Sequence, residues 1–328
     1  MTDTPNDRRT EVSRITPRSR HSFPERFGDR IIPGAARFVS ATLVLVSICL
    51  VAPAVAGGPA LELSLLVYNT HGLSSLIAGD EPERRFPLIA RHTHHYDLSL
   101  LQEDFAHHER LLAGLGTGSR ATRGNPSRFS LCPFCSGSGL TTVSNLPSTW
   151  SIQIEDAAFS ECSGWLGGLN DCLATKGLQF IELRTPAGPP LVVINTHLDA
   201  GRGSEDRRVR ALQLEEIIAA VETKAFGEAV IVAGDLNLDA DDPDDLVLLE
   251  SFKKRLGLRD SGAHPPPDSR WEILDYILYR SGVETRLEVL AAGEDEGLED
   301  EGRPLSDHPA LFARFAISTT APQKAQKE

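Results

Sequence analysis

The amino-acid sequence predicts a four-layer α/β sandwich of the α+β type, in which two packed, mostly antiparallel sheets are flanked by helices. Short β-like apolar runs alternate with clusters of turn residues along most of the chain. Amphipathic helical segments lie between some of these runs and would cover the outer faces of the sheets. Polar residues follow strand-like runs in both halves of the chain, which favours this sandwich over a parallel doubly wound sheet.

The β-like segments are short and closely spaced, and this spacing implies two sheets that pack face to face. We expect strands at residues 61–68, 98–102, 139–143, 179–183, 191–195, 229–233, 273–279, 286–290 and 310–315. Helical periodicity covers residues 83–91, 207–221 and 244–254. In the second helix, one face carries Leu214, Ile217, Ile218 and Val221, and we expect this face to be buried.

One folded domain can account for most of the chain. The 328 residues, of which 41% are hydrophobic, exceed the usual length of a single domain but fit one large β-rich sandwich. We expect a flexible leader with an export signal over residues 1–56, the folded domain over residues 57–317 and a disordered tail over residues 318–328. No internal repeat is apparent.

The part of the chain that follows the leader is strongly acidic. The formal net charge is -13, and residues 1–56 hold eight Arg against five acids, so the remainder carries 25 basic and 41 acidic groups. A protein that grips long stretches of nucleic acid draws much of its affinity from Lys and Arg. The composition therefore disfavours unassisted binding of nucleic acid.

The leader has the pattern of an export signal. Basic residues ending at Arg37 precede an apolar run over residues 38–51, and the small residues 54–56 are typical of a cleavage site. We expect the leader to be cleaved and the protein to be secreted or periplasmic. The alternative is an uncleaved membrane anchor over residues 38–55, since this stretch approaches the length needed to span a bilayer.

Cysteines follow the leader at positions 132, 135, 162 and 172. An even number in an exported chain favours disulfides, although sequence alone leaves three connectivities open. We expect neighbours to pair, Cys132 with Cys135 and Cys162 with Cys172. The alternatives for Cys132 and Cys135 are half of a zinc site or a redox motif, but no second CxxC and no thioredoxin-like pattern accompanies them.

Polar motifs directly follow strand-like runs at five places, and a sixth motif lies inside a strand. Each motif alone is common at turns, whereas together they are typical of a site built on loops of a rigid scaffold. In chain order they are Tyr68-Asn69-Thr70-His71-Gly72, Leu101-Gln102-Glu103-Asp104, Asn195-Thr196-His197-Leu198-Asp199, Gly234-Asp235-Leu236-Asn237, Leu274-Asp275-Tyr276 and Ser306-Asp307-His308-Pro309.

In this order the motifs resemble the signature of the endonuclease/exonuclease/phosphatase superfamily, which has the DNase I-like fold, over nearly all of residues 61–315. Two softer features resemble the bacterial neutral sphingomyelinase-like branch. One is the stretch over residues 171–177, and the other is residues 196–200, where that branch has Gln in place of Asp199. The resemblance implies a catalytic domain over residues 57–317 that hydrolyses a phosphodiester with the help of a divalent metal.

The implied chemistry assigns roles to the acids and amides. Hydrolysis of a phosphodiester needs neutralisation of the phosphoryl oxygens and an activated water. Hard oxygen ligands and few carboxylates suit Mg²⁺, so we expect Glu103 and Asn69 to hold Mg²⁺, or another divalent cation such as Mn²⁺ or Ca²⁺. We expect Asp235 to polarise the attacking water and Asn237 to bind a phosphoryl oxygen or a metal-bound water.

His197 and His308 are the imidazoles expected to handle protons or to bind the phosphate, and the sequence does not assign the general acid. The resemblance implies that a carboxylate orients the last histidine. Asp275 is the candidate, with Asp307 nearer the metal or phosphate. Lys176 is either a phosphate-binding cation or a solvated residue. The remaining histidines of interest are interpreted as solvated or surface residues: His92, His94, His95, His107 and His108.

The resemblance implies that the substrate is a phosphodiester, and it favours a phospholipid at a membrane surface. Aromatic content is only 6%, and no aromatic hairpin of the kind that inserts into bilayers is apparent, although the loops around Phe134 and Trp165 are alternatives. A DNase I-like endonuclease, a phosphomonoesterase and a non-enzymatic binding protein on the same fold remain alternatives. Low basic content argues against the nuclease, and the complete set of acids, amides and imidazoles argues against the binding protein. No protein partner is implied.

Overall fold

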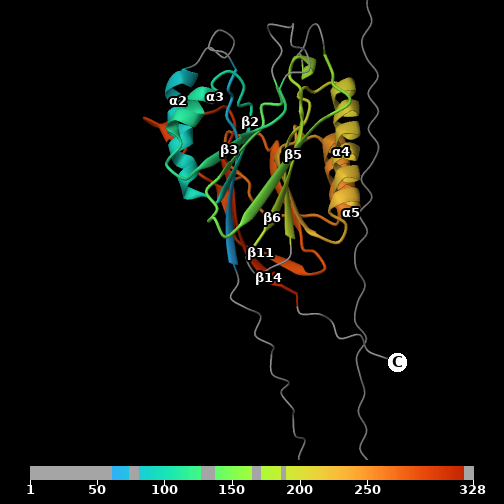
Figure 1. Ribbon diagram of the computed structural model, residues 1–328. Coiled ribbons are helices and arrows are strands. Elements are labelled where there is room, and N and C mark those ends of the chain that lie inside the picture. Colours follow the sequence, from blue (N-terminus) through green and yellow to red (C-terminus); the bar gives the residue numbers. More distant parts are fainter. Residues whose placement is uncertain (1–60, 74–80, 127–136, 165–170, 186–189, 321–328) are drawn as a thin grey trace, which may run out of the picture. The chain divides into compact units, whose positions relative to one another are not determined.

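The computed structural model describes residues 61–73, 81–126, 137–164, 171–185 and 190–320, all of which belong to one compact unit, Ala54–Glu328. Two six-stranded sheets lie at the centre of this unit (Figure 1). A short hairpin of β12 (Glu299–Asp300) and β13 (Arg303–Pro304) lies outside them.

The first sheet has the strand order β11-β14-β1-β2-β4-β3. Only β1 and β2 pair in parallel, and the other neighbours are antiparallel. The strands are β1 (Leu61–Asn69), β2 (Leu98–Gln102), β3 (Arg120–Arg123), β4 (Thr141–Ser144), β11 (Thr285–Glu294) and β14 (Leu311–Thr319).

The second sheet has the order β5-β6-β7-β8-β10-β9, and only β7 and β8 pair in parallel. Its strands are β5 (Ser151–Ala158), β6 (Gly177–Arg184), β7 (Pro190–His197), β8 (Ala229–Asp235), β9 (Arg259–Asp260) and β10 (Asp275–Arg280). The prediction of two mostly antiparallel sheets is therefore confirmed.

Three apolar clusters separate four layers. The first fills the space between the sheets with alternate residues of their strands, among them Leu65, Val67, Val193, Ile231 and Ile277. Such alternation directs every second side chain of a strand to one face. The second and third clusters lie on the outer faces of the two sheets, where helices cover them. Each buried Leu, Ile or Val contributes about 1.5–3 kcal/mol, so these layers hold the sandwich together.

Helices α2 (Pro82–His92) and α3 (His108–Gly114) cover the first sheet, and α4 (Ser204–Lys224) and α5 (Pro243–Leu256) cover the second (Figure 1). Short 3-10 turns occur at Thr93–His95 and Asp171–Leu173. The apolar face predicted for the long helix is confirmed, because the side chains of Leu214, Ile217, Ile218 and Val221 are all buried in α4. The fold class is thus an α/β sandwich with helices on both outer faces.

Several element boundaries differ from the sequence-based expectation. Asp275 is the first residue of β10 and does not lie inside the strand, because Ile273 and Leu274 accept hydrogen bonds from the loop after β8 and do not pair in the sheet. Ser318 and Thr319, expected in the tail, pair with β11 as the end of β14. β3, β5 and α3 were not expected; β3 and β5 are edge strands whose side chains are largely exposed or half-buried, so they lack a continuous apolar run.

Candidate functional site

Strand register brings three of the predicted residues side by side at one edge of the second sheet. His197 at the end of β7 pairs with Asp235 at the end of β8, and Asp235 pairs with Asp275 at the start of β10. Directly paired residues project from the same face of a sheet. Residues two positions away on these strands, such as Ala233 and Ile277, belong to the core between the sheets. The imidazole and both carboxylates therefore face the first sheet.

The first sheet contributes from the opposite side. Asn69 and Gln102 end the parallel strands β1 and β2 and are in register with each other. The Asn69 side-chain amide donates to Asp235 Oδ2 at 3.0 Å, so this hydrogen bond joins the two sheets. Below it, Gln102 Nε2 donates to Asn195 Oδ1 at 2.8 Å, which gives the apolar core a polar upper layer. The site is built at the end of the core.

Tight backbone turns place the residues that follow these strands. His71, Glu103 and Asn237 all have positive φ, with values of 46°, 56° and 48°. Such strain in non-glycine residues is uncommon and clusters at functional sites. Gly72 makes one turn possible: its N–H donates to Glu103 O at 3.0 Å, and a Cβ at this glycine would lie 2.2 Å from the same oxygen. The backbone thus holds two of the predicted motifs together.

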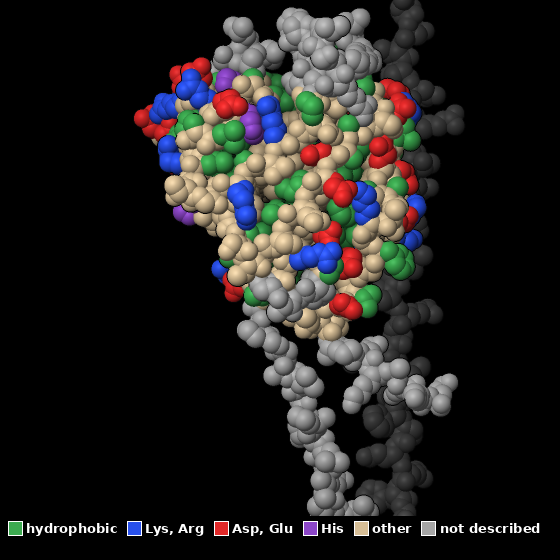
Figure 2. All heavy atoms as spheres, viewed as in Figure 1, with side chains coloured by type: hydrophobic (Ala, Val, Ile, Leu, Met, Phe, Trp, Pro, Cys, Tyr) green, Lys and Arg blue, Asp and Glu red, His purple; other side chains and the backbone are tan. Residues whose placement is uncertain are grey.

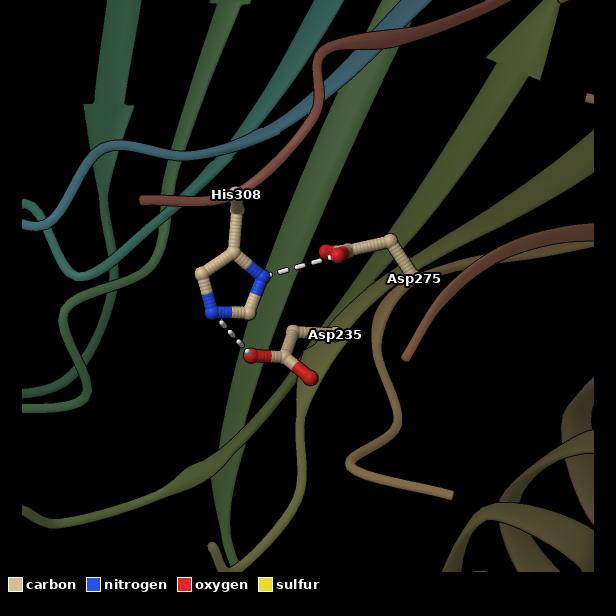
Figure 3. Close-up of side chains that lie close together, drawn as sticks. All are labelled: Asp235, Asp275 and His308. Carbon is tan, nitrogen blue, oxygen red and sulfur yellow. Dashed lines mark hydrogen bonds and ion pairs between the residues drawn. The ribbon is translucent and has the colours of Figure 1, made fainter. Parts of the chain in front are cut away.

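His308 lies between the two carboxylates (Figure 3). Its Nδ1 is 2.8 Å from Asp275 Oδ2, and its Nε2 is 3.8 Å from Asp235 Oδ2. Burial opposes protonation of this imidazole, but Asp275 and Asp235 outweigh it and raise the pKa of His308 to about 11. Burial raises the pKa of Asp275 to about 6, against the effect of His308. At neutral pH the pair is an imidazolium and a carboxylate.

His197 has the opposite electrostatic character. Lys176 Nζ lies 3.1 Å from His197 Nε2 and donates to Leu198 O at 2.6 Å. Burial, helped by the Lys176 ammonium, lowers the pKa of His197 to about 3, so this imidazole is neutral. Lys176 is only 5% exposed. Its interpretation as a solvated residue is therefore wrong, because the ammonium lies under the site.

The depressed pKa of His197 predicts an acid-dependent loss of stability. The unfolded chain protonates this histidine below about pH 6.5, whereas the folded protein keeps it neutral until the pH approaches 3. Between these values the unfolded state binds more protons, so stability falls as the pH falls. The free energy of unfolding, measured by urea titration at pH 7 and pH 4, should decrease more in the wild type than in His197→Gln. Equal decreases would contradict the assignment.

Asp235 is the centre of the site. Its Oδ1 accepts the backbone N–H of Asn237 at 2.9 Å, and its Oδ2 lies 3.4 Å from His197 Nε2. Burial favours the neutral acid, but the His308 imidazolium and the Lys176 ammonium oppose it and help to lower the pKa of Asp235. The Asn237 amide donates to Leu198 O at 3.1 Å, which ties this turn to the end of β7. Asp235 is therefore a buried carboxylate held in its ionised form.

Glu103 has the character of a metal ligand. Its Oε2 is buried and has no hydrogen-bond partner among the described residues. Burial raises the pKa of Glu103, while Lys176 and a hydrogen bond with Asn69 oppose this effect. An orphaned buried carboxylate oxygen is costly unless a cation completes it. Glu103 and Asn69 thus offer the oxygen ligands that a hard divalent cation takes.

A second group could also hold a cation. Asp235, Asp275 and His308 each offer one ligand atom, and these atoms lie within 4.8 Å of one another. The hydrogen bond to Asp275 occupies the imidazole Nδ1, and because His308 is protonated its Nε2 also carries a proton and has no lone pair for a cation. Glu103 and Asn69 therefore fit the cation better, because no imidazole has to lose a proton before their oxygens can bind it.

His71 is a site residue that the sequence reasoning did not single out. Its Nδ1 lies 3.1 Å from Asp307 Oδ2 and 3.9 Å from Glu103 Oε2. Asp307, with its side chain 58% exposed, thus lies at the rim and pairs with His71. Arg85 is a further support, since its guanidinium donates to the backbone oxygens of Thr70 and His71 at 2.9 Å each. His71 could have been selected from the sequence, because it directly follows Asn69 and Thr70 in the same motif.

Two histidines interpreted as solvated are partnered. His108 is buried, and its Nδ1 lies 2.5 Å from Asp104 Oδ2, because α3 begins directly beneath the turn that follows β2. His92 is half-buried and lies 2.5 Å from Asp295 Oδ2. His94 and His95 are exposed as expected.

The expected Cys162–Cys172 disulfide is present, whereas Cys132, Cys135, Phe134 and Trp165 lie outside the described residues.

A pocket of about 190 Å³ adjoins His308. Its lining combines the rings of Tyr68 and Trp271 with Arg270, the His308 imidazolium and several carboxylates. The carboxylates are Glu294, Asp295, Glu296 and Glu299. The space beside the imidazolium is thus small, partly aromatic and net acidic.

The chain is similar to known proteins in sequence and in fold. The sequence model of the Endonuclease/Exonuclease/phosphatase family matches residues 66–308. The sphingomyelinase of Mycobacterium bovis is 28% identical in an alignment of 272 residues that covers 77% of this chain and 52% of that protein. The Mycobacterium tuberculosis sphingomyelinase gives the same values. The chain therefore spans about half the length of these curated relatives.

Solved structures share the fold. A Staphylococcus aureus beta toxin variant with bound magnesium ions superposes with a TM-score of 0.58 at 19% identity, covering 77% of this chain and 99% of that one. Sphingomyelinase C from Streptomyces griseocarneus gives a TM-score of 0.57 at 21% identity, covering 78% and 99%.

Proposed function

The chain belongs to the endonuclease/exonuclease/phosphatase family, and we propose that it is a divalent-metal-dependent phosphodiesterase of the sphingomyelinase type. The observation that carries the proposal is the position of Asp235. This carboxylate contacts Asn69 from the other sheet and lies within 4 Å of both His197 and His308. An ionised carboxylate between a neutral and a cationic imidazole can orient a water and exchange a proton while positive charge faces the phosphate.

Hydrolysis breaks the bond between phosphorus and the leaving alcohol as water attacks from the opposite side. Asp235 orients that water and takes its proton, and the leaving alkoxide takes a proton from solvent, so that the products are a phosphomonoester and an alcohol. His308, held as an imidazolium by Asp275, stabilises the charge that develops on the phosphoryl group. Lys176 adds a second buried cation beside the neutral His197. Asn237, with its strained backbone, presents an amide without adding charge.

We assign the cation to Glu103 and Asn69, with Asp307 and His71 at the rim. When bound there, a divalent cation such as Mg²⁺ supplies positive charge to the phosphoryl oxygens. The buried Oε2 of Glu103 supports this assignment, because it has no hydrogen-bond partner among the residues that the structure describes. The magnesium ions of the beta toxin variant, which has the same fold, support a similar preference.

The substrate class we propose is a phospholipid with a small headgroup, as the names of the mycobacterial relatives suggest. The pocket beside His308 supports this choice, because four carboxylates in its lining oppose a polyanion. Figure 2 shows acidic and basic side chains interspersed over the viewed face, and no continuous basic surface of the kind that holds nucleic acid. A nuclease is therefore the weaker alternative.

The decisive experiment offers the purified full-length chain three substrates: sphingomyelin vesicles, plasmid DNA and bis(p-nitrophenyl) phosphate. We expect release of phosphocholine from sphingomyelin, loss of activity with EDTA and recovery with Mg²⁺. Cleavage of DNA without cleavage of sphingomyelin would favour the nuclease. Inactivity towards all three substrates with every divalent cation would contradict the proposal.

We also propose that the protein is exported, with a leader over residues 1–56. The Cys162–Cys172 disulfide supports an oxidising environment. None of the described helices has the length and apolar character needed to cross a bilayer.

Export predicts a defined mass for the secreted protein. Intact-mass measurement should give cleavage after Ala56 and a mass lower by four hydrogens than that of the reduced form, because both cysteine pairs would be oxidised. A sample expressed in a reducing cytoplasm is the control. Four free thiols in exported protein would contradict the prediction.

A further inference from the structure

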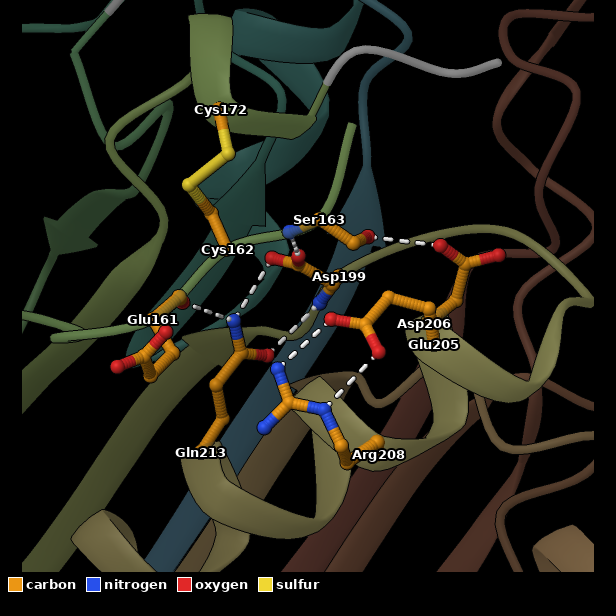
Figure 4. Close-up of a disulfide and its surroundings, with 9 residues drawn as sticks. All are labelled: Glu161, Cys162, Ser163, Cys172, Asp199, Glu205, Asp206, Arg208 and Gln213. Carbon is orange, nitrogen blue, oxygen red and sulfur yellow. Dashed lines mark hydrogen bonds and ion pairs between the residues drawn. A yellow bond between two sulfur atoms is a disulfide. The ribbon is translucent and has the colours of Figure 1, made fainter. Parts of the chain in front are cut away.

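We propose that Asp199 and Gln213 are positioning residues for Lys176. Together with Cys162, Ser163 and Cys172 they form what we call the disulfide clamp, which fastens the segment leading to Lys176 onto the end of β7 (Figure 4). This inference rests on the proposed function, because it assumes that Lys176 and His197 belong to the hydrolytic site.

The Asp199 side chain is fully buried and is held by N–H donors. Its Oδ2 accepts the backbone N–H of Ser163 at 2.6 Å, and its Oδ1 accepts Gln213 Nε2 at 2.7 Å. Its backbone N–H donates to Gln213 Oε1 at 2.9 Å. A buried carboxylate is costly unless such donors satisfy it. Removing either the Asp199 or the Gln213 side chain would therefore leave buried polar groups of the other without a hydrogen bond.

Gln213 connects this unit to the helix layer. It lies on α4, is fully buried, and also donates to Glu161 O at 3.0 Å. Ser163 has a second contact with the same helix, because its hydroxyl donates to Asp206 Oδ1 at 2.7 Å. Residues 161 and 163 are thus held on both sides of Cys162.

A closed ring of contacts links the clamp to the site. Asp199 follows His197 by two residues, and it binds Ser163, the neighbour of Cys162. The disulfide passes from Cys162 to Cys172, which precedes Lys176 by four residues. Lys176 Nζ returns to His197 Nε2 at 3.1 Å. The clamp therefore fixes both ends of the contact between Lys176 and His197.

The ring matters because a lysine side chain has four rotatable bonds and is positioned only by its surroundings. Misplacement of a catalytic group by about 1 Å can cost roughly 100-fold in rate. The family branch that the sequence resembles has Gln at position 199. The Asp199 carboxylate accepts hydrogen bonds from two N–H donors at once. The longer glutamine amide would have to accept them in a different geometry.

The test compares kinetics with disulfide accessibility in the full-length chain. Asp199→Ala and Gln213→Met should each lower kcat by about 10- to 100-fold with KM changed less than about twofold. Both should also speed reduction of the Cys162–Cys172 bridge by dithiothreitol, because Asp199→Ala releases Ser163 and Gln213→Met releases Glu161, the two neighbours of Cys162. Glu216→Ala is the matched control: Glu216 is also on α4 and holds Ser160, and its loss should change neither measurement.

If Asp199 acts through Lys176, the effect of Asp199→Ala on kcat should depend on the presence of Lys176. In a Lys176→Met background, Asp199→Ala should lower kcat by less than about twofold, because the group that it positions is already absent. Asp199→Asn keeps one acceptor and should lose less activity than Asp199→Ala. A purely structural role would instead give equal losses in both backgrounds, and that result, or wild-type kcat in both clamp variants, would overturn the proposal.

Failure of the proposed function would be recognised separately. If the wild type hydrolysed none of the phosphodiesters, the dithiothreitol measurement would still report whether Asp199 and Gln213 hold the bridge. Unchanged reduction rates in both variants would overturn the clamp whatever the activity. Thermal denaturation of each variant establishes that the kinetic values come from folded protein.

Discussion

Glu103→Gln should abolish Mg²⁺-dependent turnover while the protein stays folded. The substitution keeps the size of a side chain whose Oε2 is buried and has no hydrogen-bond partner in the described part of the chain, and it removes the negative charge that a divalent cation requires. Metal assistance contributes several kcal/mol to such reactions, so kcat should fall by at least about 100-fold. Because burial raises the pKa of Glu103, removing this acid should leave thermal stability without Mg²⁺ unchanged or higher.

Thermal denaturation with and without Mg²⁺ gives a readout that does not depend on activity. A cation that binds only the folded state raises the melting temperature, and Glu103→Gln should lose most of this rise. Glu288→Gln, a change of the same kind at an exposed position of β11, is the control and should behave as wild type. Near-normal activity of Glu103→Gln at saturating Mg²⁺ would refute the metal assignment.

The sequence predicts the central strands because each has an apolar run of sufficient length. β2 was predicted at its observed bounds, and its residues are all buried. β5 was missed, since its side chains alternate between exposed and half-buried positions and include Ser151, Gln153, Glu155 and Asp156. An edge strand of this kind is specified by its partner, β6, through their register, and register cannot be obtained from local composition.

The site was largely predictable in composition, and one of its contacts was expected as well: the resemblance implied Asp275 beside His308, and the two lie 2.8 Å apart. The residues that follow β1, β2, β7 and β8 could be selected because their types suit phosphodiester chemistry. Which residue contacts which depends on the register that places His197, Asp235 and Asp275 together. The contact between His71 and Asp307 was not predicted, because it joins loops far apart in the sequence. The opposite protonation states of His197 and His308 also follow from burial and neighbours that only the fold provides.

His308→Gln should lower kcat by about 100-fold or more, the usual effect of removing a donor that stabilises the charge developing in the transition state. Asp275→Asn should lower kcat much more than it changes KM. The reason is the 2.8 Å contact between His308 Nδ1 and Asp275 Oδ2, which orients the imidazole and keeps it protonated. Asp260→Asn is the matched control, because Asp260 makes a similar contact with His264 at 3.1 Å and should be dispensable for turnover.

The double variant distinguishes a coupled pair from two independent residues. If Asp275 acts through His308, the combined loss in kcat should be close to that of His308→Gln alone, since the orienting carboxylate then has nothing to orient. The pH profile gives a second measure. Asp275 raises the pKa of His308, so in Asp275→Asn the imidazolium loses its proton at a lower pH, and activity that depends on it should decline at a lower pH than in the wild type. Multiplicative losses together with an unshifted profile would mean that Asp275 does not support His308.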